Sequence, residues 1–151
     1  MITRANGLVL ALLVTVLVVG AAQATPPVIV PAPFVDFTDT TTCGFPLEVH
    51  FTVNGQTAKI FSDGTVRITG PVKATYTANG KSVSLNIAGP AKISPTGAVT
   101  AQGVGAGPTE LPNGELTFGY LAGQVEIDFT AGIAVLLHGH LVLDICAALA
   151  P

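Results

Sequence analysis

Residues 45–87 read FPLEVHFTVNGQTAKIFSDGTVRITGPVKATYTANGKSVSLNI, and this stretch decides the fold. Apolar and polar side chains alternate through it with a period of two, which is typical of β-strands with one dry face. The alternation breaks at Asn54-Gly55, Asp63-Gly64 and Asn79-Gly80, dipeptides that readily adopt the positive φ angles of tight turns. The stretch therefore predicts a series of antiparallel hairpins.

The pattern continues, less regularly, toward the C-terminus. Alternation returns after Asn113-Gly114, whereas the glycine-rich residues 103–112 (GVGAGPTELP) are expected to form a loop. Residues 133–145 keep apolar side chains on one parity, which predicts a strand or two bent at Gly139, with a closing helix over 144–149 as an option. With about eight to ten short strands, the chain is predicted to be an all-β antiparallel meander, either a sandwich or an up-and-down barrel.

The first 24 residues are expected to be an export signal. Arg4 precedes an apolar run over residues 8–19, and Ala22-Gln23-Ala24 fits the small-x-small pattern for cleavage after Ala24. The alternative is an uncleaved anchor, but the run is shorter than the roughly 20 residues that cross a bilayer. We therefore expect a secreted or cell-envelope-associated protein with no stable transmembrane segment after cleavage.

Composition divides the rest of the chain into an arm and a domain. Residues 25–42 (TPPVIVPAPFVDFTDTTT) are rich in Pro and Thr and predict an extended arm, although 28–30 and 34–37 could add a short edge strand. Residues 43–150 are the expected all-β domain. The nine acidic residues outnumber the six basic ones, and the sequence has no run of Lys and Arg, so nucleic acid is not an expected partner.

Cys43 and Cys146 are the two cysteines of the chain. In an exported protein an even number of cysteines predicts a disulfide, whereas no flanking signature supports a catalytic thiol or a metal site. The bridge would tie the first strand of the domain to the last, so these two strands are expected to be neighbours.

The three histidines are the candidate metal ligands. His138 and His140 are two residues apart and would share one face of a strand, and the disulfide would bring His50 near them. Three imidazoles could hold a zinc ion with an open position for hydrolysis. The alternative is three separate histidines on polar sheet faces, and without a HExxH motif no metal or other cofactor is favoured.

Other signatures of catalysis are missing from the sequence. Gly103, Gly105 and Gly107 are followed by Pro108 and do not form a dinucleotide fingerprint, and there is no Gly-x-Ser-x-Gly motif. Glu126 and Asp128 would share a strand face, which a solvated surface explains most simply. No catalytic residue is assigned.

Four short motifs carry a resemblance. Cys43-Gly44-Phe45-Pro46, Phe61-Ser62-Asp63-Gly64, Gly80-Lys81-Ser82-Val83 and the closing Asp144-Ile145-Cys146-Ala147-Ala148-Leu149 resemble small secreted β-rich proteins of actinobacteria. The resemblance covers about residues 43–150. It implies export, a Cys–Cys bridge and a β-rich domain, and it carries over no activity and no functional residue.

These observations favour a non-enzymatic secreted β-domain that binds an extracellular or envelope partner of unknown chemistry. The alternatives are a carrier that holds a small apolar ligand in a barrel cavity and a zinc-dependent hydrolase built on His50, His138 and His140.

Overall fold

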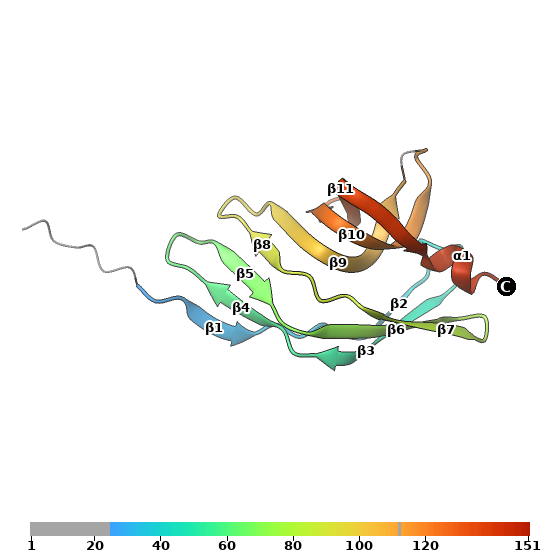
Figure 1. The fold of residues 1–151 in the computed structure, drawn as a ribbon, viewed down its shortest axis with the longest axis horizontal. Coiled ribbons are helices and arrows are strands. Elements are labelled where there is room, and N and C mark those ends of the chain that lie inside the picture. The colour runs from blue at the N-terminus through green and yellow to red at the C-terminus, as the bar shows by residue number, and fades with distance from the viewer. Residues whose placement is uncertain (1–24, 112) are drawn as a thin grey trace, which may run out of the picture.

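A computed structural model describes residues 25–151 except residue 112, so the expected export signal lies outside the described residues. The described chain forms two β-sheets and one short C-terminal helix (Figure 1). The strands are β1 (Val28–Pro31), β2 (Phe37–Asp39), β3 (Leu47–Asn54), β4 (Thr57–Ile60), β5 (Val66–Thr69), β6 (Val72–Ala78), β7 (Lys81–Asn86), β8 (Ala91–Ile93), β9 (Val99–Glu110), β10 (Leu116–Asp128) and β11 (Ile133–Asp144), and the helix is α1 (Ile145–Leu149).

The predicted all-β fold is confirmed, with two open sheets that do not close into a barrel. The large sheet has the strand order β1-β4-β5-β8-β9-β10-β11, and the small sheet has the order β2-β3-β6-β7. Neighbouring strands are antiparallel throughout the described residues, apart from one parallel bridge between Thr109 of β9 and Ala134 of β11.

Two of the three predicted hairpin turns are confirmed, and a further Asn-Gly dipeptide lies in a third hairpin. Asp63-Gly64 joins the paired strands β4 and β5, Asn79-Gly80 joins β6 and β7, and Asn113-Gly114 lies between β9 and β10. At the second turn both residues have positive φ, 52° for Asn79 and 72° for Gly80, as the sequence predicts. Local turn chemistry therefore sets these three connections.

The remaining predicted turn, at Asn54-Gly55, is wrong. β3 pairs with β2 and β6 in the small sheet, whereas β4 pairs with β1 and β5 in the large sheet. The chain passes from the small sheet to the large sheet at Gly55 and returns at Pro71, between β5 and β6. The two passages lie side by side, since the Gly55 N–H donates to the carbonyl oxygen of Pro71 at 2.9 Å. Pairing between distant strands decides the topology here, and the local dipeptide does not.

Residues 25–42 contribute an edge strand to each sheet. The option of a strand at 28–30 is realised as β1, which pairs with β4, while the strand expected at 34–37 begins only at Phe37. The Ala32 N–H donates to the carbonyl oxygen of Gln56 at 3.0 Å. The backbone N–H and C=O groups of even-numbered residues in this segment therefore point toward β4, and those of odd-numbered residues point toward the free edge. Pro31 therefore costs the sheet no hydrogen bond, and it removes a donor from the free edge.

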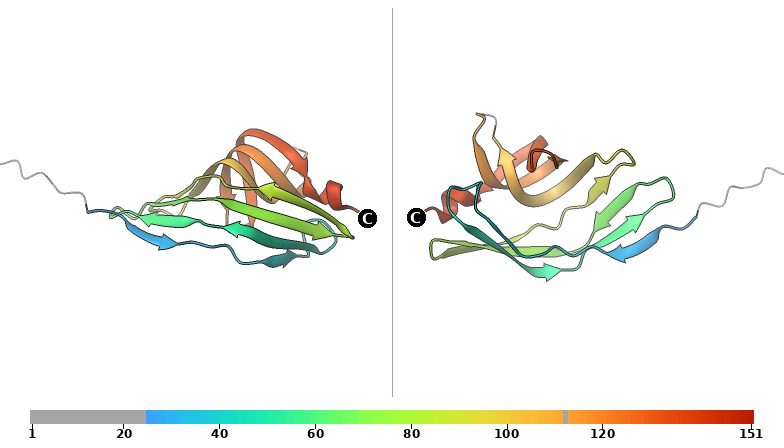
Figure 2. Two further views of the ribbon diagram at one scale, coloured as in Figure 1. Left: turned by 60° about the horizontal axis from the view of Figure 1, so that its bottom comes forward. Right: turned by 180° about the vertical axis from the view of Figure 1, so that it is seen from behind.

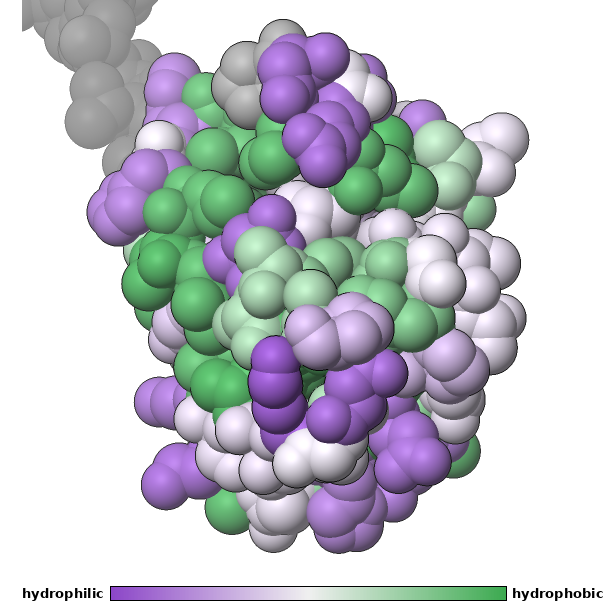
Figure 3. All heavy atoms as spheres, turned by 90° about the vertical axis from the view of Figure 1, so that its right-hand side faces the viewer, coloured by the Kyte–Doolittle hydropathy of each residue, from purple (hydrophilic) through white to green (hydrophobic). Residues whose placement is uncertain are grey.

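The core lies between the small sheet, β10 and α1. Tyr76 of β6 packs against Phe118 of β10, with ring centroids 5.6 Å apart, and burial raises the pKa of Tyr76 well above its ordinary value. The other buried members are Leu47, Val49, Ala74, Ala78, Ile145 and Leu149. Figure 3, which views the end that carries α1, shows hydrophobic side chains remaining at the surface between polar ones.

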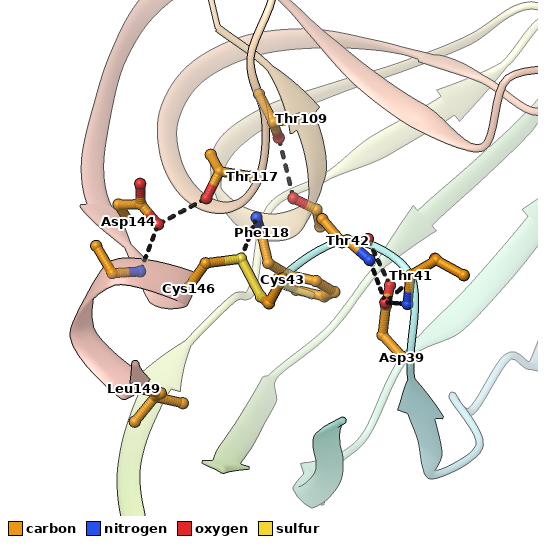
Figure 4. Close-up of a disulfide and its surroundings, with 12 residues drawn as sticks. Asp39, Thr41, Thr42, Cys43, Thr109, Thr117, Phe118, Asp144, Cys146 and Leu149 are labelled. Atoms are coloured by element: carbon orange, nitrogen blue, oxygen red, sulfur yellow. Dashed lines mark hydrogen bonds between the residues drawn. A yellow bond between two sulfur atoms is a disulfide. The ribbon is translucent and has the colours of Figure 1, made fainter. Parts of the chain in front are cut away.

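The predicted disulfide is confirmed. Cys43 precedes β3, Cys146 lies in α1, and the two sulfurs are bonded at 2.03 Å (Figure 4). The expected pairing of the first strand of the domain with the last is wrong, because β3 and β11 belong to different sheets. The bridge instead fastens the small sheet to the helix that follows the large sheet.

The helix is also fixed by Asp144 at its N-terminus. The Asp144 carboxylate accepts hydrogen bonds from the Ala147 N–H at 2.9 Å and from the Thr117 hydroxyl at 2.6 Å (Figure 4). This is the usual geometry of an N-cap, here extended to a buried threonine of β10. The closing helix that the sequence left as an option is thus present over Ile145–Leu149.

Candidate functional site

The loop expected over residues 103–112 is wrong, because residues 103–110 lie within β9. β9 pairs with β10 from Val99 to Glu110, and β10 pairs in turn with β11. We call these three strands, residues 99–110, 116–128 and 133–144, the folded ribbon. Figure 2 shows their strong curvature.

A row of three glycines crosses the folded ribbon. Gly103 lies opposite Gly123, which lies opposite Gly139, and their φ angles are 94°, 143° and 123°. A Cβ on Gly139 would overlap the carbonyl oxygen of Ala122 and lie 2.7 Å from the Cα of Gly123. Gly123 and Gly139 are therefore required because their backbones approach too closely for any side chain, whereas Gly103 is favoured by its positive φ alone.

The ribbon bends back on itself at this row. The parallel bridge brings Thr109, near the end of β9, beside Ala134, near the start of β11, although their partners on β10 are Thr117 and Ile127. The pairing of β10 with β11 also shifts register twice, between Tyr120 and Leu121 and between Gln124 and Val125. Bulges and glycine kinks of this kind produce sharp bends in sheets.

The bend forms one side of an open pocket of about 850 Å³. Most of its lining is apolar; of its polar side chains, Thr109 is buried, whereas Glu110, Asn113 and His140 are exposed. The apolar lining consists of Leu111, Leu121, Val135, Leu136, Gly139 and Leu141. We call this space the ribbon pocket. Its volume lies within the roughly 300–1,000 Å³ usual for small-ligand sites, and apolar walls with a few polar groups are typical of them.

The polar groups at the ribbon pocket limit the chemistry of its contents. Asn113 donates to the Glu115 carboxylate at 3.3 Å and accepts the Glu115 N–H at 3.1 Å, so this side chain is held in the hairpin turn. Glu110 and His140 remain as the ionisable groups of the lining. An apolar tail with a neutral or cationic polar end matches this arrangement.

The three histidines do not converge. His50 lies on β3 of the small sheet, and His138 and His140 lie on β11 of the large sheet. Across the described residues no group of three or more His, Cys, Asp or Glu side chains is placed to hold a metal ion. The expected convergence is wrong because the disulfide joins Cys43 to α1 and leaves β3 and β11 unpaired.

His50 instead pairs with the carboxylate of Asp36, in the segment over residues 25–42 that the sequence predicts to be an extended arm. Its Nδ1 lies 2.5 Å from an Asp36 carboxylate oxygen, and the other Asp36 oxygen accepts the Phe51 N–H at 2.8 Å. These two bonds, the one from Phe51 first, hold the pKa of Asp36 below its ordinary value. The pair fastens the segment between β1 and β2 to the outer part of β3.

The acidic pair Glu126 and Asp128 lies at the end of β10. Asp128 accepts the N–H groups of Thr130 and Ala131 at 2.8 and 3.1 Å, so it closes the turn into β11. Its role in the described structure is that of a turn residue.

The pocket was not among the sites that the sequence predicted. One signal for it was present, because a glycine within a strand pattern marks a bulge or a close backbone approach. Gly139 was expected to bend its strand, but Gly103 was assigned to a loop. The alignment of these two glycines with Gly123 depends on strand register, which cannot be read from the local sequence.

No helix within the described residues is long and apolar enough to span a membrane. The comparisons with family models, with curated proteins and with solved structures found no match to this chain.

Proposed function

We propose that this chain is an exported, non-enzymatic binding domain whose ribbon pocket holds a small apolar or amphiphilic molecule. The observation that carries the proposal is the open 850 Å³ pocket beside the glycine-row bend, with a mostly apolar lining and polar groups at its exposed side. The small-ligand carrier considered from the sequence is thus favoured in a modified form, since the pocket lies within one folded ribbon and not inside a barrel.

The ligand should enter with its apolar part directed at the ribbon. Leu121 is almost fully buried and lines the pocket together with the half-buried Leu136 and Leu141. Removing apolar surface of the ligand from water supplies the main driving force. Glu110 and His140 are then available to a polar end, and the Glu110 carboxylate disfavours an anionic one.

The disulfide supports a role outside the cytoplasm. Disulfides persist in oxidising compartments, and Cys43–Cys146 fixes both sheets around the core. Export itself is proposed from the N-terminal sequence, with secretion into the medium and retention at the cell envelope as the two destinations.

The test compares two substitutions on β11. Val135 and Leu137 lie on the same strand and are each 42% exposed, but only Val135 lines the ribbon pocket. Binding of the uncharged dye Nile red, followed by fluorescence, should fall at least about tenfold in Val135→Lys, since an apolar ligand that covers the pocket lining would have to desolvate the introduced charge. It should change less than about twofold in Leu137→Lys, which leaves the pocket lining intact.

Displacement of the dye identifies the polar end of the ligand. We expect dodecylamine and dodecanol to displace Nile red more effectively than dodecanoate, because of the Glu110 carboxylate. Equal dye binding by Val135→Lys and the unmodified protein would remove the ribbon pocket as the site.

A further inference from the structure

The outer part of the large sheet carries a row of positive charge. Lys59 of β4 lies directly opposite Arg67 of β5, and Arg67 lies opposite Lys92 of β8. Directly opposed residues project from the same face of a sheet, so the three cationic side chains stand side by side. All three are exposed. We call Lys59, Arg67 and Lys92 the basic row.

This arrangement is unusual for the composition of the chain. The sequence has six basic residues, one of which is Arg4 in the expected export signal, so the basic row holds three of the remaining five. Acidic residues outnumber basic ones overall. Like charges that face each other across strands destabilise a sheet. Stability of the fold therefore does not explain why the cations are collected here.

Carboxylates do not neutralise the basic row within the described residues. The only pair of opposite charges within 4.0 Å there joins His50 and Asp36, on the small sheet. Asp63, in the turn between β4 and β5, accepts the Thr65 N–H at 2.8 Å and interacts with Lys92 only through a weaker, longer-range attraction. Glu126 stands in the same row, but Thr100 of β9 separates it from Lys92.

The face beside the basic row is hollowed and carries polar side chains next to the cations. A depression of about 300 Å³ is lined by Arg67 and Lys92 together with the polar Thr69, Thr100 and Gln102 and the apolar Pro90 and Ala91. Thr69 follows Arg67 by two residues, and Gln102 follows Thr100 by two, so these side chains project from the same face as the cations. Cations beside hydroxyl and amide donors form a site suited to oxyanions. The Arg67 guanidinium is also held 5.6 Å from the centre of the Phe61 ring.

We propose that the basic row and this depression bind a linear polyanion. Neighbouring strands are about 4.8 Å apart, so three cations on consecutive strands form a line of charge rather than a single-ion cage. A chain that carries an oxyanion group at each repeat can contact all three, with hydroxyl and amide donors available beside Arg67 and Lys92. The site is on the face of β4, β5, β8 and β9 and uses no residue of the ribbon pocket.

The experiment uses the mature protein and two soluble probes, sodium polyphosphate and polygalacturonate. Calorimetry or fluorescence anisotropy should detect binding of at least one probe, weakening as NaCl increases because bound counterions are released. Tighter binding of polyphosphate assigns the site to phosphate chains, and tighter binding of polygalacturonate assigns it to carboxylate chains. Failure of both probes to bind at low salt would overturn the proposal.

Matched variants separate a local site from overall charge. Arg67→Gln/Lys92→Gln and Lys73→Gln/Lys81→Gln each remove two positive charges, but the second pair lies on β6 and β7 of the small sheet. Binding should fall at least about tenfold in the first variant and less than about threefold in the second. Arg67→Lys/Lys92→Arg keeps the charge and should retain binding. Equal losses of polyanion binding in the two Gln variants would overturn the proposal. Nile red binding should be unchanged in all these variants, and it reports on the ribbon pocket separately.

Discussion

Gly123 and Gly139 lie opposite each other on β10 and β11, and a Cβ on either residue would lie 2.7 Å from the Cα of the other. Both have φ angles that L side chains rarely adopt, 143° and 123°. The bend that forms the ribbon pocket thus depends on two backbones in direct contact. Any side chain at this point must push the strands apart.

Substituting Gly139 tests this directly. Gly139→Ala should lower the free energy of unfolding by about 2–4 kcal/mol, because it combines backbone strain with an overlap against Ala122. Gly105→Ala is the control, since Gly105 lies in β9 with open space around its Cβ position. It should change stability by less than about 1 kcal/mol. Urea unfolding followed by circular dichroism measures both, and similar values would show that the glycine row is not required.

Removing the disulfide should destabilise the whole domain. Cys43 and Cys146 are 103 residues apart in sequence, and closing a loop of this size lowers the entropy of the unfolded chain. By chain entropy alone the bridge contributes about 4–5 kcal/mol. Cys43→Ser/Cys146→Ser should therefore unfold at much lower urea than the oxidised protein. Dithiothreitol should shift the unmodified protein to the same midpoint and leave the variant unchanged; an unmodified protein insensitive to reduction would contradict this.

Asp36 should make stability depend on acidic pH. The Phe51 N–H and then His50 hold the pKa of Asp36 below 3.8, so the folded state keeps the carboxylate charged where the unfolded chain takes up a proton. This stabilisation is complete above about pH 4 and is lost as the pH falls through the lowered pKa of the folded state. Asp36→Asn should therefore lose less stability than the unmodified protein between about pH 4 and pH 2.5.

A second variant identifies which partner of Asp36 matters more. His50→Gln should show an acid sensitivity between those of the unmodified protein and Asp36→Asn, because the Phe51 N–H, the largest single cause of the lowered pKa, is retained. The other carboxylates are common to all three proteins, so the differences in their unfolding midpoints report on Asp36. If His50→Gln matched Asp36→Asn, the histidine would be the dominant partner.

The outward-facing prolines should protect the free edge of β1. Pro27 and Pro31 have the odd parity that faces away from β4, where an N–H could otherwise bond to another chain. Pro27→Val/Pro31→Val restores two donors beside the exposed Val28 and Ile29. Sedimentation velocity at increasing concentration should then show association beyond that of the unmodified protein. Pro26→Val, of the opposite parity, should not; unchanged behaviour of the double variant would show that the prolines do not protect this edge.

The local sequence determined the strands and most of the hairpins. Period-two alternation around residues 45–87 identified β3 to β7, and positive-φ dipeptides such as Asn79-Gly80 fixed turns between adjacent strands. These features depend only on side-chain alternation and on the φ preferences of two residues. The disulfide could also be predicted, because two cysteines in a chain that is expected to be exported have one intramolecular pairing.

The tertiary structure alone decided which strands share a sheet and where a ligand can bind. Asn54-Gly55 has the composition of a hairpin turn, yet β3 and β4 separate because each gains hydrogen bonds from strands farther along the chain. Gly103, Gly123 and Gly139 lie far apart in sequence and become one bend only through the register of β9, β10 and β11. The basic row arises in the same way, since the strands place opposite one another charges that the sequence spreads over residues 59–92. Strand register is decided by many contacts between residues that are far apart in sequence. A local sequence pattern therefore determines the strands and turns, whereas the pairing of the strands creates the ribbon pocket and the basic row.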